Sequence, residues 1–343
     1  MESPSPRVGI SLRWLGWAAA ALVAATFLLL RRGEWRGIGE ALRDARPGFL
    51  ILAAVLQAAW LVLFAASFWS GLAAVGVRLP FRRTLPLSWA CNFVNMVVKS
   101  GGMGGMALFL RAATSRGYAG SRTTLGYLLT LAVGYAMFLL VLAGALAALW
   151  LRNDLHRSEL IASVSTFILI LSAMVGLTVV VRSPRSMRWT YDRLARLVNG
   201  AAGLIRRRPP MDPDGGPRAA EEAEAVIRLV RGHPARLAPV VLANAGKELA
   251  GVAVLYAVLL AFHSDATPAL ALIAYALTIL FSYISIIPSG LGIVEISLTA
   301  LLIRTGVPPP AAALTTVVYR LFQFWAPFLV GAAATRFAGG NRE

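Results

Sequence analysis

Long apolar runs separated by short polar connections dominate the pattern of this chain. Several runs approach or exceed the roughly 20 residues that a helix needs to cross a bilayer, at positions 14–30, 49–77, 123–150, 159–181, 235–262, 267–287 and 310–336. Two further runs, 86–110 and 288–303, are interrupted by glycine. The pattern predicts an all-α polytopic membrane bundle of about eight transmembrane helices with one or two glycine-broken or re-entrant segments.

Arginine-rich connections indicate the orientation, because loops rich in positive charge stay in the cytoplasm. Arginines lie on both sides of run 86–110, at Arg78, Arg82, Arg83, Arg111, Arg116 and Arg122. We therefore expect both ends of this run on the cytoplasmic side, with the run dipping into the membrane and returning. Run 288–303 is expected to span, which places the C-terminus inside. The N-terminus is also predicted to be cytoplasmic, in a protein of the cytoplasmic (inner) membrane.

The composition supports one integral membrane domain over residues 1–343. The chain is 58% hydrophobic and 14% charged, with a mean hydropathy of +0.69. Residues 182–234 form the one long hydrophilic stretch and are expected to be a cytoplasmic, arginine-rich insert. The net charge of +17 would suggest a nucleic-acid partner in a soluble protein, but here the arginines follow the ends of the apolar runs. We expect no nucleic acid partner.

Charged residues inside the apolar runs are the candidate functional groups. The chain has two lysines, Lys99 and Lys247, and both lie within such runs. A cation at membrane depth costs a few kcal/mol, so it marks a polar pathway or an anionic ligand. Glu248, Glu295 and Arg320 are further charges of this kind. An alternative is that these ions neutralise one another and fix helix positions.

The two glycine-broken runs share a pattern. Lys99-Ser100-Gly101-Gly102-Met103-Gly104 and Pro288-Ser289-Gly290-Leu291-Gly292 each place a Ser-Gly break after an apolar half-helix, and the following stretches end in Arg111 and Arg304. Interrupted segments in corresponding positions of two halves point to a transporter's substrate site, whereas close helix packing is the alternative. A lysine beside free backbone N–H groups suits phosphate. The predicted substrate-binding residues are Lys99, Ser100, Gly101, Gly102, Arg111, Lys247, Glu248, Ser289, Gly290, Gly292, Glu295 and Arg320.

The C-terminal part of the chain carries a set of recognisable motifs, namely Ile287-Pro288-Ser289-Gly290-Leu291-Gly292-Ile293-Val294-Glu295, Arg304-Thr305-Gly306-Val307, Tyr319-Arg320 and Trp325-Ala326-Pro327. The resemblance that they indicate, which covers nearly the whole chain in hydropathy, is to the membrane domain of lysylphosphatidylglycerol synthase/flippase proteins. It implies a helical bundle that moves phospholipid headgroups across the cytoplasmic membrane. It also implies that Pro288, Gly290, Gly292, Glu295 and Arg320 match the family pattern.

The first half departs from that family pattern. Members commonly carry an acidic residue between the glycine break and the next arginine, where this chain has Met103, Met106 and apolar residues before Arg111. A second acidic residue, early in the next span, is also missing from the stretch GYLLT at 126–130. These departures leave the headgroup open, above all a cationic one. Full-length synthases add a cytosolic aminoacyl-transfer domain, which we do not expect after Phe337.

These patterns favour a flippase or transporter of a phospholipid or lipid-linked substrate. The alternatives are an intramembrane transferase with Glu295 or Glu248 as general base, or a non-catalytic partner of envelope-lipid biosynthesis enzymes. The sequence contains no GxxxxGK[ST] phosphate-binding loop, and its three histidines are scattered singly. We therefore expect no enzymatic activity, no metal and no cofactor.

Overall fold

The computed structural model describes residues 43, 45–97, 104–151, 215–262, 265–285 and 290–338, with short pieces between 167 and 193. Within these residues the regular structure is helical, and four stretches are long and apolar enough to cross a membrane. They are α3 (Pro47–Ala74), α6 (Gly120–Leu151), α10 (Ala238–Phe262) with the short η2 (Pro234–Leu237) before it, and the continuous α13 (Pro309–Arg320), η4 (Leu321–Trp325) and α14 (Ala326–Ala338). The predicted helical membrane bundle is confirmed. The expected spans at 14–30 and 159–181 lie outside the described residues, apart from short helical pieces of the second.

Local sequence signals explain where these helices start. Proline stands in the first turn of α3, α13 and α11 (Pro268–Ile284), where its missing N–H costs no helical hydrogen bond. At α11 the Thr267 hydroxyl also accepts a hydrogen bond from the Leu270 N–H, at 3.2 Å. Because α3 is apolar on all sides, it can pack against protein and still expose Ile51 and Val55 to lipid.

Two pairs of shorter helices flank the glycine breaks. They are α4 (Phe81–Val97) with α5 (Met106–Thr114), and α11 with α12 (Ile293–Arg304). The 9 residues of α5 and the 12 of α12 extend about 14 and 18 Å, well short of the roughly 30 Å of a hydrocarbon core. Each pair therefore has the dimensions of a hairpin that enters the membrane and returns.

The helix within run 288–303, α12, is shorter than a spanning helix needs to be. Positive-φ glycines at both ends shorten the helix, because Gly292 (φ +86°) precedes it and Gly306 (φ +91°) follows it. Gly306 donates its N–H to the Ile303 carbonyl at 3.0 Å, which closes the last turn. The apolar run is therefore longer than the helix that it forms.

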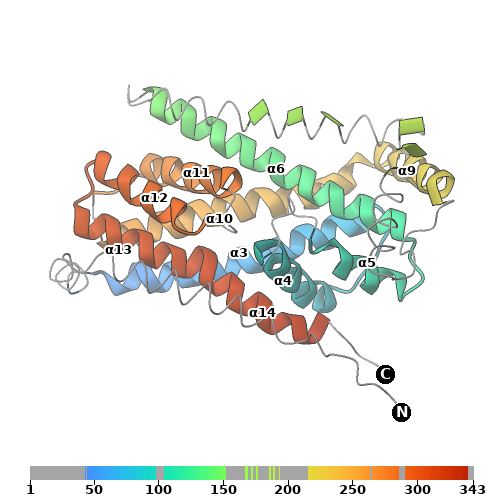
Figure 1. Ribbon diagram of the computed structural model, residues 1–343, viewed down its shortest axis with the longest axis horizontal. Coiled ribbons are helices and arrows are strands. Elements are labelled where there is room, and N and C mark those ends of the chain that lie inside the picture. The colour runs from blue at the N-terminus through green and yellow to red at the C-terminus, as the bar shows by residue number, and fades with distance from the viewer. Residues whose placement is uncertain are drawn as a thin grey trace, which may run out of the picture.

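The order of a long helix, a broken pair and a second long helix occurs twice, in α3 to α6 and in α10 to α14. The two first helices, α3 and α10, pack along each other in opposite directions, since the Arg46 N–H before α3 bonds the Ala261 carbonyl near the end of α10 at 3.0 Å. Helix α4 packs on α14, and α11 packs on α6. In Figure 1 the two broken pairs lie on opposite sides of the α3 and α10 contact, with α11 and α12 at one end and α4 and α5 at the other. This is the arrangement of inverted repeats in transporters.

Helix α9 (Gly215–Gly232) ends the predicted insert and lies against α6 (Figure 1). Its apolar face buries Ala220, Ala223 and Val226. Arg122 of α6 donates from Nε to Glu222 Oε2 of α9 at 2.9 Å. Helix α9, the last part of the insert, is therefore attached to the membrane bundle.

Gly331→Ala is expected to destabilise the contact between α14 and α4. A Cβ at Gly331 would lie 2.5 Å from the Trp89 carbonyl oxygen and 2.7 Å from the Phe93 Cβ. Overpacking of this kind costs about 1–3 kcal/mol, which a lower midpoint of thermal unfolding in detergent would report. Gly48→Ala is the control, because a Cβ there meets nothing within 4 Å. Equal unfolding midpoints for the two variants would contradict this packing.

Candidate polar site between the two halves

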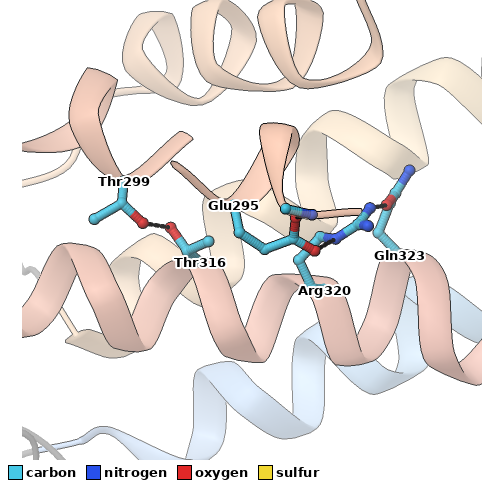
Figure 2. Close-up of polar contacts among 6 residues, drawn as sticks. Glu295, Thr299, Thr316, Arg320 and Gln323 are labelled. Carbon is cyan, nitrogen blue, oxygen red and sulfur yellow. Dashed lines mark hydrogen bonds and ion pairs between the residues drawn. The ribbon is translucent and has the colours of Figure 1, made fainter. Parts of the chain in front are cut away.

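Glu295 joins the second glycine break to the last long helix. It stands in the first turn of α12, where its Oε2 accepts the Gly292 N–H at 2.6 Å. Its Oε1 accepts a hydrogen bond from Arg320 Nε of α13 at 2.7 Å (Figure 2). Glu295 is 9% exposed and Arg320 is 3% exposed. One carboxylate therefore fixes the break, α12 and α13 relative to one another.

Arg320 is held on its other sides as well. Its terminal nitrogen donates to Gln323 Oε1 at 3.0 Å, and its guanidinium carbon lies 4.9 Å from the centre of the Phe324 ring. Gln323 and Phe324 belong to η4, a π-helical segment that begins directly after Arg320. Such wider turns within helices are frequent at functional sites. The wider turn thus supplies two of the groups that surround the arginine.

A second contact joins the same two helices one turn away. The hydroxyl groups of Thr299 in α12 and Thr316 in α13 are buried and lie 2.9 Å apart (Figure 2). Together with the Glu295 and Arg320 pair, this bond gives two polar contacts between α12 and α13, one helical turn apart. Because both contacts are buried, they hold the hairpin against α13.

A second buried ion pair lies in α10. Lys247 Nζ is 2.8 Å from Glu248 Oε1, and Tyr275 of α11 donates its hydroxyl to Glu248 Oε2 at 2.7 Å. The side chains of Lys247 and Glu248 are 15% and 7% exposed. Helix α6 makes room for this pair at Gly134, where a Cβ would lie 3.0 Å from Asn244 Oδ1 and 3.8 Å from Lys247 Nζ.

A small cavity of about 30 Å³ lies among α3, α10, α11 and the α13 to η4 junction. Tyr275 from the Glu248 group and Gln323 from the Arg320 group both line it, together with Gln57 and Tyr319. Gly251 lies at its wall, where a Cβ would come within 2.6 Å of the Tyr275 ring. The cavity therefore connects the surroundings of the two ion pairs.

The structure brings some of the predicted site residues together. Gly292, Glu295 and Arg320 form one group, Lys247 and Glu248 form the other, and Gly290 is buried with φ +66° at the break. Arg111 lies exposed on α5, in the other half, and belongs to neither group. Lys99, Ser100, Gly101, Gly102 and Ser289 lie outside the described residues.

The sequence reasoning missed Gln57, Tyr275, Tyr319 and Gln323. Their signal was weak, because glutamine and tyrosine occur in many apolar helices without a special role. Gln323 follows Arg320 by three residues and Tyr319 by four, the spacing of side chains on one helix face, which could have marked Gln323. Within the described residues, no group of three or more His, Cys, Asp or Glu side chains could hold a metal ion.

At the corresponding positions that the structure describes, the first half has apolar residues in place of the Glu295 and Arg320 pair. Counted from Gly101 and Gly290, Met106 corresponds to Glu295, and counted from the first residues of α6 and α13, Leu131 corresponds to Arg320. Met106 and Leu131 pack on the apolar cluster around Phe68, Phe109 and Tyr127. The two repeats therefore differ in chemistry, with an ion pair in the second and apolar packing in the first.

Two comparisons with known proteins confirm the family resemblance. A family model described as the lysylphosphatidylglycerol synthase TM region matches residues 13–331. A UPF0104 membrane protein of Methanothermobacter thermautotrophicus is 24% identical over 330 residues, which cover 93% of this chain and 93% of that protein. Both matches extend over the two halves and their broken helix pairs.

Arg320→Met is expected to lower the free energy of unfolding by about 3–5 kcal/mol, because it leaves the Glu295 carboxylate buried without its cation. The double variant Glu295→Gln/Arg320→Met removes both charges and is expected to lose less. Thermal unfolding in detergent for the wild type, both single variants and the double variant measures this coupling. Losses that simply add in the double variant would show that the two side chains are not coupled.

Proposed function

The chain belongs to the lysylphosphatidylglycerol synthase TM family, and on this basis we propose that it moves phospholipid or lipid-linked headgroups across the membrane. The headgroup passes through the polar interior between the two halves, while the acyl chains stay in the bilayer. One observation carries the proposal: two largely buried ion pairs of the second half lie on either side of a cavity that α3 of the first half also lines. Charges at such depth are expected on a substrate pathway.

Phosphate is the headgroup feature that these side chains fit. Arg320 and Lys247 are the cations of the two pairs, and Lys99 is a third, predicted one. In the structure, the carboxylates of Glu295 and Glu248 form ion pairs with Arg320 and Lys247. A phosphate offers the same type of oxygen acceptor in more than one direction, so it can replace a carboxylate at a guanidinium or ammonium group. Between transport events, when no phosphate is bound, Glu295 and Glu248 pair with the cations in its place.

Access to Arg320 requires the α12 hairpin to separate from α13. At 3% exposure Arg320 cannot meet a headgroup as it stands. The break before Gly292 and the turn at Gly306 bound α12 on both sides, so this short helix can move as a unit. In a protein built of inverted repeats, movement of one half exposes the site to one side of the membrane, and movement of the other half exposes it to the opposite side.

The proposal keeps the predicted location in the cytoplasmic (inner) membrane, with the N-terminus and residues 182–234 inside. Helix α14 ends in the same part of the bundle as α4, α5 and α9 (Figure 1). The arginines on the connections of that part, among them Arg78, Arg82 and Arg116, favour the cytoplasmic side by the positive-inside rule.

Purified protein in liposomes is expected to exchange labelled phospholipids between the leaflets. Lys247→Gln, Lys99→Gln and Arg320→Gln each remove one phosphate-binding cation, and each is expected to slow exchange of an anionic lipid by about tenfold or more, since a hydrogen bond to a charged group contributes about 1.5–3 kcal/mol. Arg336→Gln is the control, because Arg336 is exposed near the end of α14. Leaflet exchange is measured by chemical quenching of the label, with circular dichroism to verify folding.

Absence of exchange for anionic and zwitterionic lipids alike, with folded protein, would contradict the proposal. The intramembrane transferase would then be tested by product analysis with a lipid-linked substrate. The non-catalytic role would be tested by co-purification of envelope-lipid biosynthesis enzymes.

A further inference from the structure

Both buried ion pairs reach the central cavity through a hydrogen-bonded side chain. From one side, Lys247 contacts Glu248, and Glu248 accepts the hydroxyl proton of Tyr275, which lines the cavity. From the other side, Glu295 contacts Arg320, and Arg320 donates to Gln323, which also lines the cavity. Figure 2 shows the second of these chains, from Glu295 to Gln323. The cavity therefore separates two chains of polar side chains, one that ends at Tyr275 and one that ends at Gln323.

Tyr319 indicates what fills this cavity. Its hydroxyl is buried, and within the described part of the chain it has no hydrogen-bond partner although it belongs to the cavity wall. A water molecule requires a cavity of more than about 10–15 Å³ and two to four polar partners. The cavity of about 30 Å³ meets the first condition. Four of its lining residues, Gln57, Tyr275, Tyr319 and Gln323, carry polar groups from which the partners can come.

We propose that this cavity is a hydrated proton-transfer site, and that Glu248 carries one proton with each headgroup. A hydronium ion in the cavity gives its proton to the Tyr275 oxygen, while Tyr275 passes its own hydroxyl proton to Glu248 Oε2. Hydronium becomes water, Tyr275 stays neutral, and the Glu248 carboxylate becomes a carboxylic acid. Lys247 then loses its ionic partner and can bind a phosphate oxygen. Release on the other side runs these transfers in reverse.

The surroundings of Glu248 are suited to this exchange. The titratable or charged groups that interact with it are Lys247 on its own helix, Tyr275 and Tyr283 from α11, and Tyr319 from α13. Arg320 of α13 and Tyr135 of α6 lie one step further away, where they interact with Tyr319 and Tyr283. Helix α3 contributes the neutral Gln57 to the same cavity. Lys247 is therefore the cation in direct contact with Glu248, and protonation of Glu248 frees it.

Charge balance gives the direction of coupling. This inference rests on the proposed transport of a phosphate-containing headgroup. A phosphate that moves alone carries its negative charge through the apolar bundle, which is costly. A phosphate that moves together with the proton on Glu248 carries no net charge. The proton and the lipid therefore travel in the same direction.

A pH gradient across liposomes tests this coupling with a labelled anionic phospholipid. With one proton per lipid, a gradient of one pH unit is expected to shift the final distribution about tenfold towards the alkaline side, and a pH-sensitive dye inside the liposomes is expected to report the accompanying proton movement. Glu248→Gln and Tyr319→Phe should abolish the shift. Thr315→Val is the control, because Thr315 carries another buried hydroxyl without a partner in the described residues, on the same helix but outside the cavity lining.

The outcomes separate this inference from the proposed function. Lipid exchange that ignores the gradient and moves no protons overturns proton coupling and leaves lipid movement standing. Absence of any exchange overturns the proposed function and the coupling together. A readout without transport is infrared spectroscopy of the protein in detergent during a pH titration, in which the wild type should show one carboxylic-acid component more than Glu248→Gln. Identical spectra for the two proteins would overturn the role of Glu248.

Discussion

A charged side chain inside an apolar helical bundle requires a partner there, because neither lipid nor apolar protein can solvate it. In this protein Glu295 and Arg320 meet the requirement by pairing with each other. Their pairing fixes the positions of α12, α13 and η4 in the second half. The carboxylate holds the N-terminus of α12 through the Gly292 N–H, and the guanidinium holds the start of η4 through Gln323. The short α12 is thus tied to α13 by a hydrogen bond between two charged groups.

The two repeats use the same architecture for different chemistry. In the second, an ion pair closes the broken helix pair against the next long helix, whereas in the first the corresponding positions are Met106 and Leu131 in an apolar cluster. At the first break, Asn95 accepts the Gly105 N–H at 2.8 Å, a neutral bond in a comparable place. When the apolar contact of the first half separates, no charge is left without a partner. When the Glu295 and Arg320 pair of the second half separates, Arg320 needs another anion. This asymmetry suits a bundle whose second half recognises the headgroup.

Sequence reasoning came close to the main helices but could not supply the pairing within them. Runs 49–77 and 235–262 nearly coincide with α3 and α10, because apolarity over this length is enough to specify a spanning helix. Charges at membrane depth marked Glu295 and Arg320, yet their pairing depends on how α12 packs against α13. The length of α12 was overestimated, because hydropathy does not register that Gly292 and Gly306 end the helix. Tyr275 and Tyr319 gained significance only from the cavity between them.

The most direct test of this account asks whether α12 must leave α13 for lipid to move. Thr299→Cys/Thr316→Cys places sulfurs where two hydroxyls lie 2.9 Å apart, in a Cys91→Ser background that removes the single native cysteine. Lipid exchange would be measured in liposomes for the reduced and the disulfide-linked protein. The account predicts exchange by the reduced form, its loss on oxidation and its return with reductant. Equal exchange by both forms, with the disulfide verified by mass spectrometry, would contradict it.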